Sequence, residues 1–270
     1  MDPRQATELA QRVVARRWPA ALAVVLAGSN GAGRATPTSD LDLVVLLPPP
    51  GPVLRETVGR APLTELFVHT AESWQVFVAK ETAARRSPLL HMCASGVLVR
   101  DVGGHGARLQ REARHRWAAG PPPLTSAESN DRRYVLTALV DDLGGSCEPD
   151  ELLTVGAEVF AAAGELTLLR RRRWLGRGKW LVRRWSATDP DGCAAACSGL
   201  RRLAATGDPR ELVAAAARAL DAAGGRVGAG YRRLAPDSTV RGAAPRPGRS
   251  GGLRAATRRE LSARRSVPRG

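Results

Sequence analysis

The stretch LAGSNGAGRATPTSDLDLVVLL, residues 26–47, says more about the fold than any other part of this chain. An apolar run ends in Gly28-Ser29, a polar loop of ten residues follows, and a second apolar run starts with Asp40 and Asp42 around a leucine. In a strand, residues two apart project from the same face. We therefore expect the two carboxylates to point together, beside a loop whose backbone N–H groups favour anions. Such an arrangement is suited to hold Mg²⁺ on the phosphates of a nucleotide.

Each part of this pattern has an ordinary alternative. Gly-Ser after an apolar run is usually a turn, and Asp-x-Asp at a strand start is usually a solvated edge or a turn cap. The combination is more specific, and it resembles the signature of the polymerase-β-like nucleotidyltransferase superfamily. The resemblance implies a transferase that moves a nucleoside monophosphate from an NTP, with Mg²⁺ as cofactor and pyrophosphate as product. ATP is the first expectation for the NTP, so that AMP is the group transferred.

Length and composition set limits on the class of protein. A chain of 270 residues with 43% hydrophobic residues is long enough for one or two domains with buried cores. It has no run of about 18 uncharged apolar residues, so we expect no membrane-spanning helix. The segment MDPRQATELAQRVVARRWP carries acids and lacks the apolar stretch of a signal peptide. These features predict a cytoplasmic protein.

The charge is strongly positive but uneven. The net charge is +15, and only Lys80 and Lys179 among the 41 basic residues are lysine. Residues 235–270 are rich in Arg, Gly, Pro and Ser, and we expect them to be disordered. A basic chain raises the possibility of nucleic-acid binding. Aromatic residues are only 4% of the chain, however, and none is interleaved with basic residues as a platform for stacking bases.

Hydrophobic periodicity and helix breakers predict an α+β region followed by helices. A helix is expected at 5–17, strands at 22–27, 41–47, 63–69 and 96–101, and further helices at 72–86 and 106–117. The proline-rich piece 118–123 is the best domain boundary. Beyond it, helices are expected at 127–143, 149–173, 177–186, 192–205 and 208–223.

The predicted fold class is therefore an α+β nucleotidyltransferase domain, a small mixed sheet with flanking helices, followed by an all-α helical-bundle domain and a disordered basic tail. The domains are predicted at 1–120, 121–234 and 235–270. This layout resembles that of the aminoglycoside-type nucleotidyltransferases, which modify antibiotics.

Transfer of this kind needs neutralisation of a triphosphate, so a third carboxylate is expected on a neighbouring strand. Glu65 fits, because it lies in an apolar strand on the face opposite Leu66 and Val68. The alternative is an ordinary surface residue. By resemblance, Asp40, Asp42 and Glu65 are the metal ligands and catalytic acids.

The loop after the first strand is expected to bind the triphosphate. Glycine at 28 lets the backbone come close, and Ser29 offers a hydroxyl and an N–H group. Ser39 is expected to orient either the neighbouring carboxylate or the triphosphate. Arg34 is either a phosphate ligand or solvated.

The helical half offers two further candidates. Asp141 and Asp142 end an apolar helix against the preference of the helix dipole, and by resemblance one of them is the general base. The alternative is that they are surface acids paired with Arg132 or Arg133. Lys179 begins a helix, where a bound anion would resolve its conflict with the dipole. By resemblance it binds the phosphates; otherwise it is a solvated lysine.

The sequence leaves the acceptor open. A hydroxyl of a small molecule is the first hypothesis, and an antibiotic is the familiar example in the family. A pocket for a highly cationic aminoglycoside should be rich in carboxylates, whereas acids are scarce here. The alternatives are an RNA or a protein partner, as for tRNA-modifying enzymes and antitoxins, and a non-catalytic protein that keeps the fold.

Overall fold

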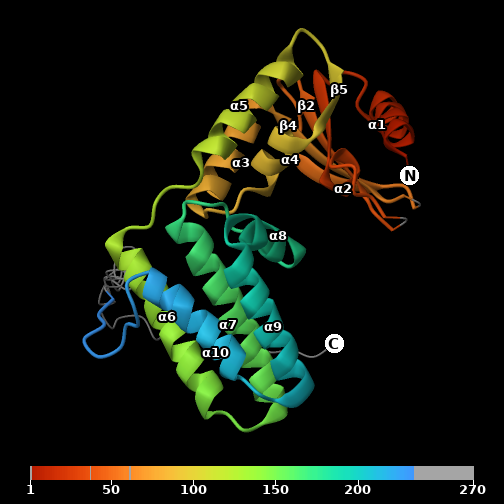
Figure 1. The fold of residues 1–270 in the computed structure, drawn as a ribbon. Coiled ribbons are helices and arrows are strands. Elements are labelled where there is room, and N and C mark those ends of the chain that lie inside the picture. The colour runs from red at the N-terminus through yellow and green to blue at the C-terminus, as the bar shows by residue number, and fades with distance from the viewer. Residues whose placement is uncertain (1, 37, 61, 234–270) are drawn as a thin grey trace, which may run out of the picture. The chain divides into compact units, whose positions relative to one another are not determined.

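The computed structural model describes residues 2–36, 38–60 and 62–233 (Figure 1). Residues Met1–Tyr231 form one compact unit. The expected disordered tail at 235–270 lies outside the described residues. The division between domains at 120 and 121 stays a prediction.

A five-stranded mixed sheet forms the centre of the first half, as the sequence predicted. Its strands lie in the order β3-β4-β2-β1-β5. Strand β2 runs parallel to β4 and antiparallel to β1, while β1–β5 and β3–β4 are antiparallel pairs. The strands are β1 (Ala23–Ala27), β2 (Leu41–Leu47), β3 (Leu54–Val58), β4 (Thr64–Thr70) and β5 (Val97–Asp101).

Helices cover both faces of the sheet (Figure 1). Leu41, Leu43 and Val45 of β2 point to the face covered by α1 (Pro3–Arg17), whose start is fixed by a capping box at Asp2. The opposite face, which includes Val44, is covered by the helices α3 (Ala71–Ala83), α4 (Pro88–Ser95) and α5 (His105–Ala119). This face also positions the functional side chains described below.

Besides the single helical turn α2 (Gly28–Gly31), two elements of the first half are not among the predicted ones. Strand β3 is an edge strand in which only alternate residues are half-buried, and its charged residues hide the apolar period. Helix α4 is only eight residues long, and its Ser-Pro start resembles a turn in the sequence. Both elements contribute residues to the site, so these omissions matter for function.

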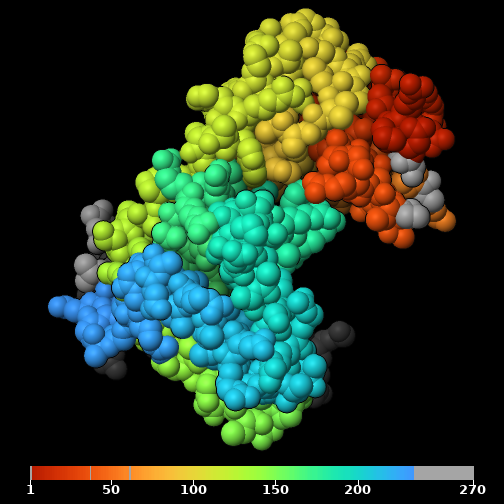
Figure 2. Space-filling view, viewed as in Figure 1, coloured from red at the N-terminus to blue at the C-terminus, as the bar shows by residue number. Residues whose placement is uncertain are grey.

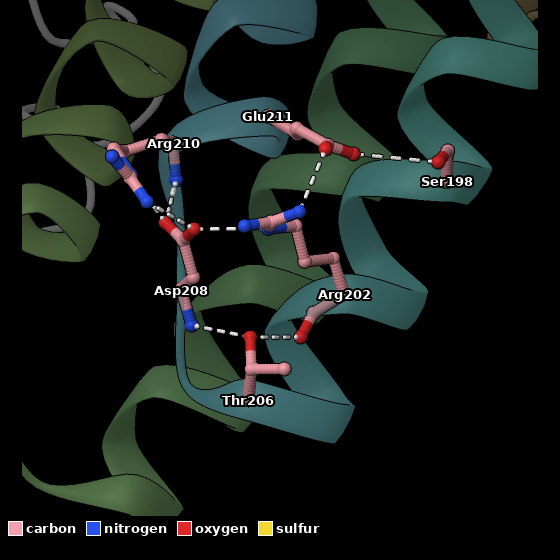
Figure 3. Close-up of polar contacts among 6 residues, drawn as sticks. All are labelled: Ser198, Arg202, Thr206, Asp208, Arg210 and Glu211. Carbon is pink, nitrogen blue, oxygen red and sulfur yellow. Dashed lines mark hydrogen bonds and ion pairs between the residues drawn. The ribbon is translucent and has the colours of Figure 1, made fainter.

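Five helices make up the second half, close to the predicted ranges, and share a core of their own. They are α6 (Ser126–Gly145), α7 (Pro149–Arg170), α8 (Lys179–Thr188), α9 (Pro190–Thr206) and α10 (Arg210–Ala222). Figure 3 shows the turn between α9 and α10, where Arg202 bridges Asp208 and Glu211. A hydrogen bond from Arg210 is the main cause that lowers the pKa of Asp208.

Among the described residues, α7 is the one helix long and apolar enough to cross a membrane. It is also the central helix of this core, and 56% of its most apolar window is buried inside the protein. Burial against neighbouring helices accounts for that composition without a membrane.

The two halves contact each other through aromatic residues and arginines. Trp174, just after α7, packs into the core of the sheet side and stacks on Trp117 of α5 with ring centroids 5.4 Å apart. Arg86, between α3 and α4, pairs with Glu165 of α7 at 2.7 Å. These contacts place the start of α8 next to the end of the sheet where β2 begins.

Candidate functional site

Gly28 brings the backbone directly against Asp42. The φ angle of Gly28 is +63°, a backbone conformation that residues with a Cβ rarely adopt. A Cβ at this position would lie 1.8 Å from Oδ2 of Asp42. Only glycine fits this position. The expected loop is ordered from its first residue, because Gly28–Gly31 forms a single helical turn, α2.

The rest of the loop is tied to the start of β2. The buried side chain of Asn30 donates a hydrogen bond to the backbone carbonyl of Asp40 at 2.7 Å. The hydroxyl of Ser39 accepts a hydrogen bond from the backbone N–H of Thr36 at 2.8 Å. Ser39 therefore closes the loop in addition to lining the site.

The predicted carboxylates lie near one another at the end of two parallel strands. Asp42 of β2 is the register partner of Glu65 of β4. Burial, followed by the charges of Glu65 and Asp40, raises the pKa of Asp42 to about 6. Lys179 and Arg55 act in the opposite direction but are outweighed. A bound cation would stabilise the charged form of Asp42 in this half-buried position.

Glu65 is held by an arginine from the edge strand that the sequence analysis missed. One guanidinium nitrogen of Arg55 lies 2.7 and 2.8 Å from the two carboxylate oxygens of Glu65. Among the described residues, no group of three or more His, Cys, Asp and Glu side chains is arranged to hold a metal ion. The assignment of Asp40, Asp42 and Glu65 together as metal ligands stays a prediction.

The other predicted ligands, except Arg34, meet in a small hollow of about 190 Å³. Its surface is predominantly polar, and it lies where the β1–β2 loop faces the start of α8. Figure 2 shows this contact, where green-blue residues of the helical half touch orange residues of the sheet half. The small hollow is lined by Gly28, Ser29, Thr38, Ser39, Asp40, Asp42, Lys179, Trp180 and Arg183.

A second, large hollow of about 770 Å³ shares Gly28, Asp42 and Trp180 with the small one. It extends between β3, β4, α3, α4 and α8. Its other lining residues are Val53, Leu54, Arg55, Phe67, His69, Phe77, Glu81, Arg86, Pro88, Leu89, His91, Met92, Leu175, Gly176, Arg177 and Arg184.

An aromatic stack forms one side of the large hollow. The ring of His91 lies 4.6 Å from Trp117 and 4.9 Å from Trp180, centroid to centroid. Burial, with smaller contributions from the charges of Arg184 and Arg34, lowers the pKa of His91 to about 4. The imidazole is therefore neutral at pH 7. Arg34 lines neither hollow, and its charge acts on this histidine.

Asp141 and Asp142 lie elsewhere. They line a different hollow, between the end of α6 and the start of α7, with Asp150 and Glu151. The start of α6 faces the sheet side through Glu128, and a helix rises about 1.5 Å per residue, so these acids lie about 20 Å further along. Asp141 pairs with Arg226, and neither acid reaches the carboxylates of β2 and β4.

Sequence reasoning missed several residues of the site. Arg183 lies one helical turn after Lys179, and that i, i+4 spacing is the signal that would have found it. Asn30 and Trp180 stand inside motifs that were already singled out. Arg55 had no comparable signal, because its importance comes from the pairing of β3 with β4, which brings its side chain within reach of Glu65.

The family comparison agrees with this geometry. Residues 8–79, which include β1, the loop, β2 and β4, match the nucleotidyltransferase domain family. The chain carries a polymerase-β-like nucleotidyltransferase domain. It is therefore a transferase, and an NTP co-substrate follows, since nucleotidyltransferases take their transferred group from an NTP.

Two further comparisons are more distant. No curated protein sequence matches the nucleotidyltransferase chain. A nucleotidyltransferase-like protein from Exiguobacterium sibiricum, known from a crystal structure, is similar with a TM-score of 0.38 and 11% identity. The likeness covers 80% of this chain and 73% of that one, and it is too distant to carry an argument about function.

Proposed function

We propose that the protein is a Mg²⁺-dependent nucleotidyltransferase that moves AMP from ATP to a hydroxyl group of a small molecule. The observation that carries this proposal is that Asp42 lines both hollows. A carboxylate at the junction lies beside both the triphosphate and the acceptor, which is where in-line transfer takes place.

The residues of the small hollow suit a triphosphate. Ser29 and Ser39 offer hydroxyl donors, and Lys179 and Arg183 offer positive charge on the opposite side. Charge-assisted hydrogen bonds from such groups to phosphate are stronger than those between neutral groups. Because these cations belong to the helical half, nucleotide binding would draw α8 towards the β1–β2 loop.

The donor set also fits a magnesium ion. Mg²⁺ is commonly held by one or two protein carboxylates together with phosphate oxygens of the substrate. Asp40 and Asp42 supply that number, and the charges of Glu65 and Asp40 add to the effect of burial in raising the pKa of Asp42. When bound, the ion would neutralise developing negative charge on the transferred phosphate.

Glu65 is the carboxylate proposed to accept the proton of the acceptor hydroxyl. It lies beside Asp42 on the neighbouring strand, and Arg55 fixes its orientation. A carboxylate has about four acceptor positions, so contact with one guanidinium leaves capacity for a hydroxyl proton. This proposal replaces Asp141 and Asp142 as the general base, since Glu65 is the register partner of Asp42, whereas those acids line a separate hollow.

Two measurements test the proposal. Pyrophosphate release is measured with Mg²⁺, each of the four NTPs and a panel of hydroxyl compounds, with Asp42→Asn as the control. Binding of a non-hydrolysable ATP analogue is measured with and without Mg²⁺. The proposal is supported if the analogue binds only with Mg²⁺ and if Asp42→Asn abolishes this binding. It is refuted if neither the removal of Mg²⁺ nor the Asp42→Asn substitution affects binding of the analogue.

A further inference from the structure

The large hollow identifies the chemical class of the acceptor, an inference that rests on the proposed function. During transfer, the attacking hydroxyl and the leaving pyrophosphate lie on opposite sides of the α-phosphorus. Since the small hollow suits the phosphates, the acceptor approaches Asp42 from the large hollow. A volume of about 770 Å³ is typical of sites for small molecules.

The walls of the large hollow favour a ligand with an apolar body. Leucine, valine, methionine and phenylalanine side chains make up much of the lining. Val53 and Phe77 are 45% and 42% exposed, although both are large apolar residues. A ring or an alkyl group placed between them and Trp180 would remove this apolar surface from water.

The charges of the large hollow are unequal. Four arginines but only two acids, Asp42 and Glu81, line it. The carboxylate of Glu81 accepts hydrogen bonds from the hydroxyl of Ser87 at 2.8 Å and from the backbone N–H of Leu89 at 3.1 Å. This carboxylate is therefore tied to the start of α4, and the arginines outnumber the acids in the wall.

Two of the four arginines have carboxylate partners, and two do not. Arg55 pairs with Glu65 and Arg86 pairs with Glu165. Within residues 2–36, 38–60 and 62–233, no ion pair is formed by Arg177 or Arg184.

Arg184 is fixed in place as a cation facing the hollow. It donates a hydrogen bond to the backbone carbonyl of Leu175, and its guanidinium lies 4.9 Å from the ring centroid of Trp117 and 5.7 Å from that of Trp180. Burial, followed by the charge of Arg86, lowers its pKa to about 10. The guanidinium is therefore a half-buried cation, whose charged form a bound anion would stabilise.

We propose that the acceptor is a small hydroxyl compound with an aromatic or apolar body and an anionic group, a carboxylate or a phosphate monoester, bound by Arg177 and Arg184. Its hydroxyl oxygen forms a bond to the α-phosphorus of ATP while the bond from that phosphorus to the bridging oxygen breaks. Pyrophosphate leaves with the electron pair, and the hydroxyl proton passes to Glu65. A polycationic aminoglycoside is disfavoured, because its ammonium groups would lie among these arginines.

Matched probes test this class directly. Hydroxyphenylpropionate, its amide and tyramine share a phenol and differ in charge, and hydroxymethylphenyl phosphate supplies the phosphate arm. Dissociation constants are measured from tryptophan fluorescence with Mg²⁺ and a non-hydrolysable ATP analogue present. We expect the wild type to bind the two anions at least about tenfold more tightly than the amide, and tyramine most weakly.

Three variants separate charge from folding. Arg177→Ala removes an exposed side chain, and Arg184→Gln keeps a donor for the Leu175 carbonyl. Each is expected to bring anion binding within about twofold to threefold of amide binding while leaving affinity for the ATP analogue unchanged. Arg201→Ala removes an exposed charge from α9 and is expected to behave as the wild type.

Several results would overturn the inference. If the wild type binds the charged and neutral probes equally tightly, Arg177 and Arg184 do not bind an anionic group of the acceptor. If the two arginine variants lose as much affinity for the ATP analogue as for the anions, the large hollow binds the nucleoside instead of the acceptor. Modification of RNA, but of none of the small anions, excludes a small acceptor. If Asp42-dependent analogue binding persists, the proposed function stands in the first two cases, and in the RNA case only its Mg²⁺-dependent transfer of AMP stands. If the wild type binds no analogue, both proposals fail.

Discussion

The Asp40–Asp42 pair lies in a hollow where two cations balance the two acids, whereas the described residues that line the hollow of the Asp141–Asp142 pair include four acids and no cation. Around the first pair are Lys179, Arg183 and two serine hydroxyls. Around the second are Asp150 and Glu151, in a hollow of about 700 Å³ with four acids in its wall. A triphosphate is attracted to the first and repelled by the second.

Backbone geometry adds to this difference. Residues two apart at the start of a strand point to one side, whereas consecutive residues on a helix do not face each other. The first pair therefore projects from one side of β2 into the small hollow, while the second pair lines its larger hollow from two directions on α6. A pair of carboxylates becomes a nucleotide site only when the fold places cations and hydroxyls on its other side.

The largest effect is expected from Asp42→Asn, which removes the carboxylate shared by both hollows. We expect kcat/KM for AMP transfer to fall by about 100-fold or more, because charge neutralisation supplies much of the rate in phosphoryl transfer. Pyrophosphate release is the measurement. The matched control is Asp141→Asn, and a similar loss there would reverse the distinction between the two pairs.

Gly28→Ala should have the next largest effect, because the new Cβ would collide with the Asp42 carboxylate. A displacement of about 1 Å at a reacting centre can cost about 100-fold in rate, so we expect a loss of that order. Gly33→Ala is a matched control, since Gly33 has φ +65° but open space around its Cβ position. Equal losses in both variants would mean that backbone strain, and not this contact, explains the effect.

Lys179→Ala tests the contribution of the helical half to the first pair. We expect the KM for ATP to rise by about tenfold to 100-fold, which corresponds to the free energy of one hydrogen bond to a charged group. Lys80→Ala changes the only other lysine of the chain, outside the small hollow, and should leave the KM for ATP unchanged. If the two variants match, Lys179 is a solvated lysine.

The pKa of Asp42 predicts a cost in stability for the first pair. Because the folded protein binds this proton more tightly than the unfolded chain, ionisation of Asp42 destabilises the fold progressively as pH rises from about 4 to about 6. Asp42→Asn should therefore raise the free energy of unfolding without Mg²⁺ by about 1–2 kcal/mol at pH 7, allowing for solvent screening.

That gain should disappear below about pH 4, where Asp42 is protonated in both states. Thermal melts of the wild type and the variant across this range measure it. A gain that does not depend on pH would point to a cause other than ionisation.

The smallest effect is expected from the second pair. Asp141→Asn and Asp142→Asn should change kcat/KM by less than about twofold, because surface substitutions away from a site have small effects. Loss of the Asp141–Arg226 ion pair at the surface should also cost little stability. A large fall in kcat with unchanged KM would restore these acids as general bases.

Most helices and four of the five strands followed from local signals. Apolar periodicity, glycine pairs and proline-rich breaks are properties of short segments, and they were sufficient for the ranges of α6 to α10. Strand β3 was missed because an edge strand buries only alternate residues, and its charged members obscure the pattern. Its residue Arg55 was missed with it, and so was the contact that orients Glu65.

The sequence by itself determined the local chemistry of the site: a glycine where the backbone must come close, two aspartates on one side of a strand start, and a third acid on an apolar strand. These choices depend on backbone geometry over a few residues. Only the tertiary structure decided which charges share a hollow. It placed Lys179 and Arg183 opposite Asp42, put Asp141 and Asp142 in a separate place, and lined the large hollow with arginines. The physical reason is that electrostatic interactions act through space, so their partners depend on how distant segments pack and not on their order in the chain.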